Sequence, residues 1–155
     1  FNIINHSNKL ELNITEAVVL DLFSGVGSFG LECLSRGVKK ITFVENYDGV
    51  LPILKRNLAN LKSVTNYEIL KKNIYEKNIF LNFKYQIDLI FIDPPYKDKK
   101  LNQIFENIKE TEILNKNGII ILHRHKNEKD VIPKGFTIVE EKKYGLSKII
   151  FISLD

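Results

Sequence analysis

The sequence predicts an α/β fold, a doubly wound and mostly parallel seven-stranded sheet that ends in an antiparallel hairpin. Short apolar runs alternate with helical patterns along the chain, without repeats or low-complexity linkers. Several of these runs are apolar on both faces, as the strands of a covered parallel sheet are. Near the end of the chain, two strand-like segments are separated only by a Tyr-Gly turn, which indicates a hairpin.

One domain, residues 1–155, accounts for the whole chain, because 155 residues with 44% hydrophobic composition suffice for a single core. The sequence holds neither a long apolar run nor a signal-peptide pattern, so we expect a cytoplasmic, monomeric protein without a membrane span. No methionine occurs, so Phe1 is not a natural start and we expect an N-terminally truncated chain. The single cysteine, Cys33, lies in a helical pattern and is expected to be buried, which excludes disulfides and zinc.

The predicted strands are five apolar runs, at residues 18–22, 41–44, 67–70, 87–92 and 119–122. A first helix over residues 29–36 ends at Gly37, which acts as its C-cap. A second helix extends to residue 61; Asp48 can cap its N-terminus, and Pro52 falls within its first turn, where proline is tolerated. Residues 136–143 and 147–154 form the hairpin.

A nucleotide-binding motif follows the first predicted strand. The stretch VLDLFSGVGSFGLE places Gly25, Gly27 and Gly30 in G-x-G-x-x-G register, where glycines allow a tight turn and a close approach to a ligand. Glu45, at the end of the next strand, can accept hydrogen bonds from both hydroxyls of a ribose. Asp21 would repel a pyrophosphate and favours a cationic ligand such as S-adenosylmethionine. The alternative is that Asp21 only accepts hydrogen bonds from loop amides.

A second motif, Asp-Pro-Pro-Tyr, ends the strand IDLIFI. Because this strand and the first one should end at the same sheet edge, Asp93 is expected to face the glycine loop. Pro94 and Pro95 lack N–H donors and favour extended backbone, which aims the Pro94 carbonyl outward. That carbonyl and the Asp93 carboxylate can each accept one N–H of an exocyclic amine, while Tyr96 offers a face to an extruded base. The alternative is a Pro-Pro turn with a capping Asp and a core Tyr.

Basic residues cluster beside several predicted strand ends, and the formal net charge is +4. A basic rim suits a polyanion, although solvated loop charges are the common alternative. The clusters are Arg36, Lys39 and Lys40; Lys71 and Lys72; Lys97, Lys99 and Lys100; and Arg124 with Lys126.

Four stretches, FNII, VVLDLFSGVGSFGLECLSRGVKKITFVE, IDLIFIDPPY and KKYGLSKIIFI, closely resemble the RsmD family of bacterial 16S rRNA guanine-N2 methyltransferases. The resemblance implies a Rossmann-like class I methyltransferase fold, S-adenosylmethionine as cofactor, and transfer of its methyl group to a guanine N2 amine. It implies 16S rRNA as the partner, in a small ribosomal subunit or an assembly intermediate. RNA binding and rRNA processing follow from the same likeness.

The resemblance also assigns roles to residues. It places Asn73 beside the adenine amine of the cofactor, although a helix N-cap is an equal alternative for this residue. The expected cofactor site comprises Asp21, Phe23, Gly25, Gly27, Gly30, Glu45, Asn46, Asn73 and Ile74, and the expected catalytic motif comprises Asp93, Pro94, Pro95 and Tyr96.

The sequence departs from the family pattern in three places. The segment that normally precedes Phe1, with a hairpin implicated in cofactor and RNA contact, is missing, and Val26 replaces a serine. His123 stands where the family often has Glu; a metal pair of His123 and His125 is conceivable, but we expect surface residues and no metal.

Other functions remain open. The Asp-Pro-Pro-Tyr motif suits an adenine-N6 amine of RNA or DNA equally well, although the chain leaves no stretch for a DNA target-recognition domain. A non-catalytic RNA-binding or ribosome-assembly module with the same fold is a second alternative. A nicotinamide dehydrogenase is a remote third, and Asp21 argues against it.

Overall fold

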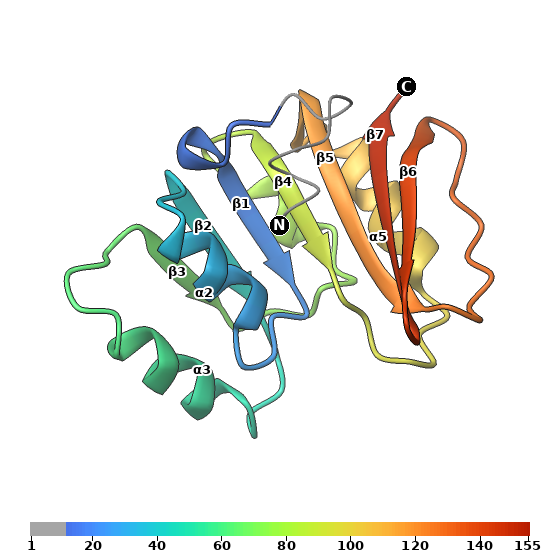
Figure 1. Ribbon diagram of the computed structural model, residues 1–155. Coiled ribbons are helices and arrows are strands. Elements are labelled where there is room, and N and C mark those ends of the chain that lie inside the picture. Colours follow the sequence, from blue (N-terminus) through green and yellow to red (C-terminus); the bar gives the residue numbers. More distant parts are fainter. Residues whose placement is uncertain (1–11) are drawn as a thin grey trace.

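A seven-stranded sheet with strand order β3-β2-β1-β4-β5-β7-β6 runs through the molecule (Figure 1). The computed structural model describes residues 12–155; residues 1–11, with the FNII stretch, lie outside the described part. The strands are β1 (Val18–Leu22), β2 (Lys40–Val44), β3 (Tyr67–Leu70), β4 (Ile87–Ile92), β5 (Leu114–His125), β6 (Phe136–Tyr144) and β7 (Ser147–Leu154). The first five strands pair in parallel, whereas β7 pairs antiparallel with both β5 and β6, so the predicted sheet and hairpin are confirmed.

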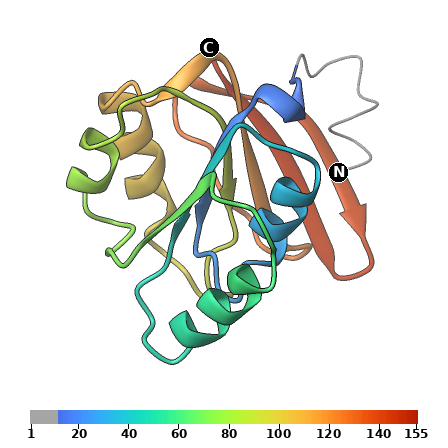
Figure 2. The ribbon, with the colours of Figure 1, turned by 90° about the vertical axis from the view of Figure 1, so that its left-hand side faces the viewer.

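Helices cover both faces of this sheet. They are the 3-10 helix η1 (Ile14–Glu16), α2 (Ser28–Ser35), α3 (Leu51–Ala59), α4 (Asn78–Leu81) and α5 (Leu101–Glu110). Figure 2 shows α2 on one side of the sheet and α4 and α5 on the other. None of the helices in the described part of the chain is long and apolar enough to cross a membrane.

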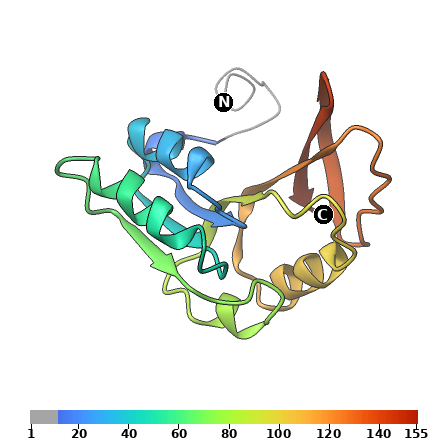
Figure 3. The same ribbon diagram turned by 90° about the horizontal axis from the view of Figure 1, so that it is seen from below.

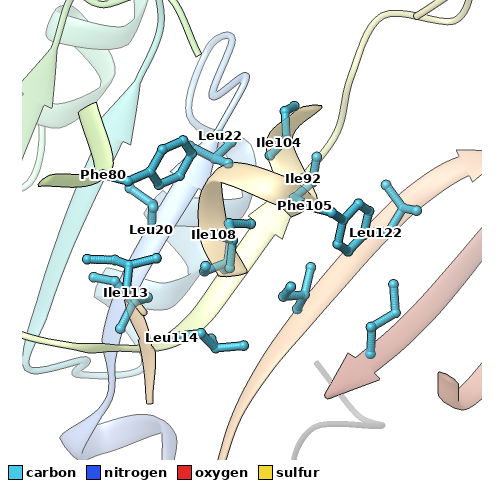
Figure 4. Close-up of a cluster of buried hydrophobic side chains, with 14 of the residues drawn as sticks. Leu20, Leu22, Phe80, Ile92, Ile104, Phe105, Ile108, Ile113, Leu114 and Leu122 are labelled. Carbon is cyan, nitrogen blue, oxygen red and sulfur yellow. The ribbon is translucent and has the colours of Figure 1, made fainter. Parts of the chain in front are cut away.

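The hydrophobic core consists of two clusters, one on each face of the sheet, because successive side chains of a strand point to opposite faces. Leu20 and Leu22 of β1 point toward α4 and α5, where they join Phe80 and Ile104 (Figure 4). Val19, one position along, belongs to the opposite cluster under α2 and α3. Burial on both faces explains why the parallel strands are nearly continuous apolar runs, since successive side chains point to opposite faces of a strand.

The topology brings three loops to one edge of the sheet. Strand β1 lies between β2 and β4, so the chain order reverses there, and a ligand crevice forms outside the carboxyl ends of strands at such a point. Leu22 is in register with Val44 of β2 and Ile92 of β4, which places the residues that follow each of them side by side. Figure 3 views the molecule from this edge.

The predicted start of the second helix is wrong. Helix α3 begins at Leu51, its N-cap is Val50, and Asp48 makes no capping bond but pairs with Lys71 at 2.5 Å between Oδ1 and Nζ. A helix that began at Asp48 would need the amide hydrogen of Pro52 for its first backbone bonds, and proline has none. The helix therefore starts just before the proline.

Candidate active site

The loop between β1 and α2 folds back over the end of β1. Phe23, Gly25 and Gly27 all take left-handed backbone conformations, with φ of 59°, 55° and 88°. Glycine adopts this region freely, whereas a bulky side chain such as that of Phe23 does so at a cost that the surroundings must offset. Ser24 helps to hold the loop in this conformation, because its hydroxyl donates a hydrogen bond to the Asp21 carbonyl, with 2.7 Å between the two oxygens.

Gly27 and Gly30 allow α2 to pack directly on β2 and α3. A Cβ atom at Gly27 would lie 2.5 Å from Cδ1 of Leu54, and one at Gly30 would lie 2.1 Å from Cε1 of Phe43. Gly30 is therefore buried in a packing contact, and its amide faces Asp21 inside the molecule. The sequence motif indicated backbone approach to a ligand at all three glycines; at Gly30 the close neighbour is the sheet.

Asp21 is a buried carboxyl group without a cationic partner in the described part of the chain. Its exposed fraction is 1%, and its Oδ2 accepts one hydrogen bond, from the Gly30 N–H at 3.2 Å. Burial above all, together with the charges of Asp93 and Glu45, raises the pKa of Asp21 to about 8, although the hydrogen bond from the Gly30 amide acts in the opposite direction. A buried acid of this kind favours a cationic ligand, which would compensate the charge.

Glu45 joins the glycine loop to the loop after β2. Its Oε2 accepts from the Gly25 N–H at 2.9 Å, and its Oε1 accepts from the N–H groups of Asn46 and Tyr47 at 2.9 and 2.8 Å. A carboxylate has about four acceptor positions, so three backbone donors leave room for about one more. Asn46 itself is exposed at this edge of the sheet.

Asn73 and Ile74 follow β3 on the same edge. The side-chain oxygen of Asn73 accepts from the Tyr75 N–H at 3.2 Å, so this residue caps a turn, and no helix begins there. The side chain of Ile74 is buried in the core, with 2% exposed, so only its main chain can face a ligand.

The Asp-Pro-Pro-Tyr segment leaves the end of β4 beside β5. Asp93 keeps 47% of its side chain exposed, and its Oδ1 lies 2.9 Å from Nδ1 of His123. Pro94 is buried, and no hydrogen bond reaches its carbonyl from any described residue. Tyr96 is 59% exposed, with its ring edge-on to His125 at 5.5 Å between centroids. The exposure of Tyr96 goes against the alternative of a core tyrosine.

These side chains line an open hollow of about 250 Å³. Its walls come from the end of β4, the end of β5 and the turn between β6 and β7. The lining residues are Asp93, Pro94, Tyr96, His123, Arg124, His125, Leu146 and Ser147. The hollow therefore lies on the far side of Asp93 from β1, so that Asp93 stands between this hollow and Asp21.

Arg124 fastens the Asp-Pro-Pro-Tyr segment to the rest of the fold. Only 3% of its side chain is exposed; Nε donates to both carboxylate oxygens of Asp130 at 3.1 Å, and a terminal nitrogen lies 3.5 Å from the Pro95 carbonyl. The Pro95 carbonyl also accepts from the Asp98 N–H at 2.9 Å. The sequence pattern predicted that Arg124 belongs to a basic rim; this prediction is wrong, because the side chain is buried and paired with Asp130.

A second connection, missed by sequence reasoning, joins this segment to the loop after β3. The Tyr75 hydroxyl donates to Oδ2 of Asp98, and its ring meets Phe23 edge-on at 5.9 Å between centroids. Burial, followed by the contact with Asp98, raises the pKa of Tyr75. The loops after β1, β3 and β4 are thereby connected through Tyr75.

The basic residues divide between two edges of the sheet. Arg36, Lys39 and Lys40 precede or begin β2 and therefore lie at the opposite edge from the site, so they are not part of a basic rim around it. Exposed lysines that do follow strands at the site edge are Lys71, Lys72, Lys97, Lys99, Lys100 and Lys126. Residues 12–155 contain no cluster of three or more His, Cys, Asp or Glu side chains that could hold a metal ion.

Comparison with known proteins gives a consistent picture. A family described as "Conserved hypothetical protein 95" matches residues 1–153. The curated protein named ribosomal RNA small subunit methyltransferase D from Haemophilus influenzae is 31% identical over 140 residues, which cover 90% of this chain and 72% of the relative. The protein of the same name from Escherichia coli K12 is 29% identical and covers 89% of this chain and 69% of its own length.

The fold is also that of solved structures. A structure from Escherichia coli, described as a methyltransferase, superposes with a TM-score of 0.81 at 26% identity and covers 100% of this chain and 83% of its own. The likeness extends over the whole sheet, including the antiparallel hairpin, and shows a class I methyltransferase fold.

Proposed function

We propose a function for this chain, which belongs to the RsmD family of methyltransferases. Its relatives are named as methyltransferases of the small-subunit ribosomal RNA. We infer that this protein, too, methylates 16S rRNA in the cytoplasm, using S-adenosylmethionine and the exocyclic N2 amine of a guanine. Two acids carry the proposal. Asp21 is buried and has no cationic partner among residues 12–155, and Asp93 is half exposed at the end of the adjacent strand.

The chain's own residues fit a cationic nucleoside cofactor. The Asp21 carboxyl needs a positive group to be ionised without cost, and the bent loop allows a close approach at Gly25, where an added Cβ would meet nothing nearer than the Phe23 carbonyl oxygen at 4.0 Å. Glu45 retains about one acceptor position for a ribose hydroxyl. The main chain at Ile74 and the side chain of Asn73 would face the adenine. S-adenosylmethionine supplies an electrophilic methyl group at its sulfonium.

Catalysis would come from orientation of the amine. An arylamine nitrogen is a poor nucleophile, because its lone pair is delocalised into the ring. The Asp93 carboxylate and the Pro94 carbonyl would each accept one N–H, so that the lone pair turns toward the methyl group. As the nitrogen–carbon bond forms, the carbon–sulfur bond of the donor would break with its electron pair left on sulfur as a neutral thioether. The nitrogen would lose one proton, which Asp93 could accept and pass to water. Holding reactants in this way can lower a barrier by about 7 to 11 kcal/mol.

Tyr96 would hold the base. Its ring is exposed beside Asp93, and a flat aromatic face stacks on an unstacked base. The exposed lysines that follow β3, β4 and β5 add attraction for the phosphate backbone.

One experiment separates the candidate functions. The protein is incubated with small-subunit particles and isotope-labelled S-adenosylmethionine, and the RNA is then digested to nucleosides for mass spectrometry. We expect labelled N2-methylguanosine. Label in N6-methyladenosine would move the proposal to adenine, and an unlabelled RNA from protein that binds the particles would favour a non-catalytic module.

A further inference from the structure

A row of side chains crosses the end of strands β5, β7 and β6, and the proposed reaction does not use it. His125 is opposite Ser147 in the β5–β7 pair, and Ser147 is opposite Tyr144 in the β7–β6 pair. Residues directly opposite each other on antiparallel strands project from the same face of a sheet. His125, Ser147 and Tyr144 therefore lie in one row across three strands.

This row lies on a part of the sheet that the helices leave uncovered. His125 shares the face of Ile121, because the two lie an even number of positions apart on β5, and Ile121 belongs to the cluster under α2 and α3. These helices lie toward β1, β2 and β3, and in Figure 1 no described helix stands in front of β6 and β7. Tyr144 is accordingly 57% exposed, whereas Arg124 and Lys148 on the opposite face are buried.

The row continues the hollow beside Asp93. Tyr96 is edge-on to His125, with 5.5 Å between the ring centroids, and Ser147 belongs to the wall of the hollow. The side chain of Ser147 is short, so within the row it leaves a gap between the rings of His125 and Tyr144. Neighbouring strands lie about 4.8 Å apart, so the backbones of these two residues are roughly 10 Å from each other. The surface thus leads from Tyr96, which would hold the target base, outward to Tyr144.

Lysine side chains surround the row. Lys126 is exposed directly after β5. Nζ of Lys142 lies 3.0 Å from a carboxylate oxygen of Glu140. Nζ of Lys143 lies 3.7 Å from one of Glu141. Exposed ion pairs of this kind contribute little to stability, so a phosphate can take the place of either carboxylate. Aromatic rings on an open sheet face, with basic groups beside them, are a recurrent means of binding single-stranded RNA.

We propose that Tyr144 stacks on a nucleotide that flanks the target guanine, so that the tip of the β6–β7 hairpin binds the single-stranded RNA around the target. The inference rests on the proposed function and deepens it, because it names the surface that receives the flanking RNA. Tyr96 lies beside Asp93 and holds the reacting base, whereas Tyr144 contributes only to binding.

The test measures equilibrium binding of a nine-nucleotide single-stranded RNA with one central guanosine among uridines. In two further RNAs, an abasic site replaces the nucleotide on one side or the other of the guanosine. Wild-type protein should bind one of these abasic RNAs about 5- to 150-fold more weakly than the intact RNA, as expected for one stacked base. Tyr144→Ala should bind the intact RNA more weakly by a similar factor, and the abasic site should then cause little further loss.

Three further variants complete the experiment. Tyr144→Phe keeps the ring and should bind like wild type. Tyr85→Ala is the matched control, because Tyr85 is 60% exposed but precedes β4 at the opposite edge of the sheet. Tyr144→Trp introduces the only tryptophan of the chain. Its fluorescence should be quenched by the intact RNA and much less by the abasic RNA that wild type binds weakly, which tests the stacking without loss of an aromatic ring.

Several results would overturn the inference. One is Tyr144→Ala that binds the intact RNA as tightly as wild type, and another is an abasic penalty of equal size in both proteins. Wild-type protein that shows no abasic penalty, or tryptophan fluorescence that the intact RNA leaves unchanged, would overturn it as well. None of these measurements needs methyl transfer. A protein that methylates no guanine refutes the proposed function, and the binding ratios still decide the role of Tyr144.

Discussion

The negative charge of Asp93 raises the pKa of the buried Asp21 carboxyl, so the two acids, which belong to the neighbouring strands β1 and β4, lie close enough to interact. One is enclosed and the other is half exposed. Under the proposed function, this relationship would place the site for a cationic cofactor next to the site for the amine, the arrangement that methyl transfer to an exocyclic amine requires.

Asp21→Asn should make the ligand-free protein less sensitive to pH. The folded-state pKa of Asp21 is raised to about 8, so the stability associated with its protonated form is fully present below pH 4 and is lost as the pH rises to 8. The free energy of unfolding of wild-type protein should therefore fall, relative to Asp21→Asn, by up to about 1.4 kcal/mol per pH unit in that window. Urea unfolding at pH 5 and pH 8 measures this, with the exposed Glu106→Gln as the control. If the free energy of unfolding changes with pH by the same amount in wild type and Asp21→Asn, the raised pKa of Asp21 is contradicted.

Glu45→Ala should weaken binding of S-adenosylmethionine by about 1 to 3 kcal/mol, the usual loss when one partner of a charge-assisted hydrogen bond is removed. Three backbone N–H groups also lose their acceptor, so the variant should be less stable. Calorimetric titration shows whether the affinity changes, and thermal unfolding monitors the fold. Unchanged affinity in a folded variant would place the ribose elsewhere.

The fold could be predicted from local patterns in the sequence, and the two motifs were also recognisable there. Continuous apolar runs indicated covered parallel strands, and the glycine register indicated the bend that Gly25 and Gly27 make. Asp21 and Asp93 could be assigned to one edge, because parallel strands that point the same way end together. Helix α5 was not delimited, although Leu101, Ile104, Phe105 and Ile108 have helical spacing and face the core.

Contacts between distant loops could not be predicted. Arg124 looked like a solvated charge, because its partner Asp130 lies in a loop without any periodic pattern. Nothing in the sequence indicated that Tyr75 reaches Asp98, or that His123 rather than solvent would meet Asp93. Such contacts depend on the relative positions of neighbouring strand ends, and these positions are set only when the sheet has assembled.

Arg124→Met should destabilise the protein by about 3 to 5 kcal/mol, because it leaves the Asp130 carboxylate buried without its partner. The Pro95 carbonyl also loses a donor, so the Asp-Pro-Pro-Tyr segment is less firmly held. Urea unfolding measures the loss. The double variant Arg124→Met/Asp130→Leu, which removes the unpaired charge, should recover part of it; a single variant as stable as wild type would show that the pair is dispensable.

Tyr96→Ala should weaken binding of the RNA target by about 1 to 3 kcal/mol, the contribution of stacking one base on an aromatic ring. Tyr96→Phe keeps the ring and should bind nearly as well as wild type. Equilibrium binding of target RNA to the three proteins distinguishes a stacking role from a structural one. Equal losses in both variants would assign the effect to the hydroxyl group instead.

The most direct measurement is single-turnover methylation of small-subunit RNA by Asp93→Ala, with binding of S-adenosylmethionine determined in parallel. Removal of a preorganised polar group from a reaction site commonly lowers the rate by about 10² to 10³, and we expect a loss of that size with nearly unchanged cofactor affinity. Glu76→Ala, an exposed carboxylate on a neighbouring loop, serves as the matched control and should react at the wild-type rate. If Asp93→Ala methylates the RNA as fast as wild type, the Asp-Pro-Pro-Tyr segment does not orient the amine.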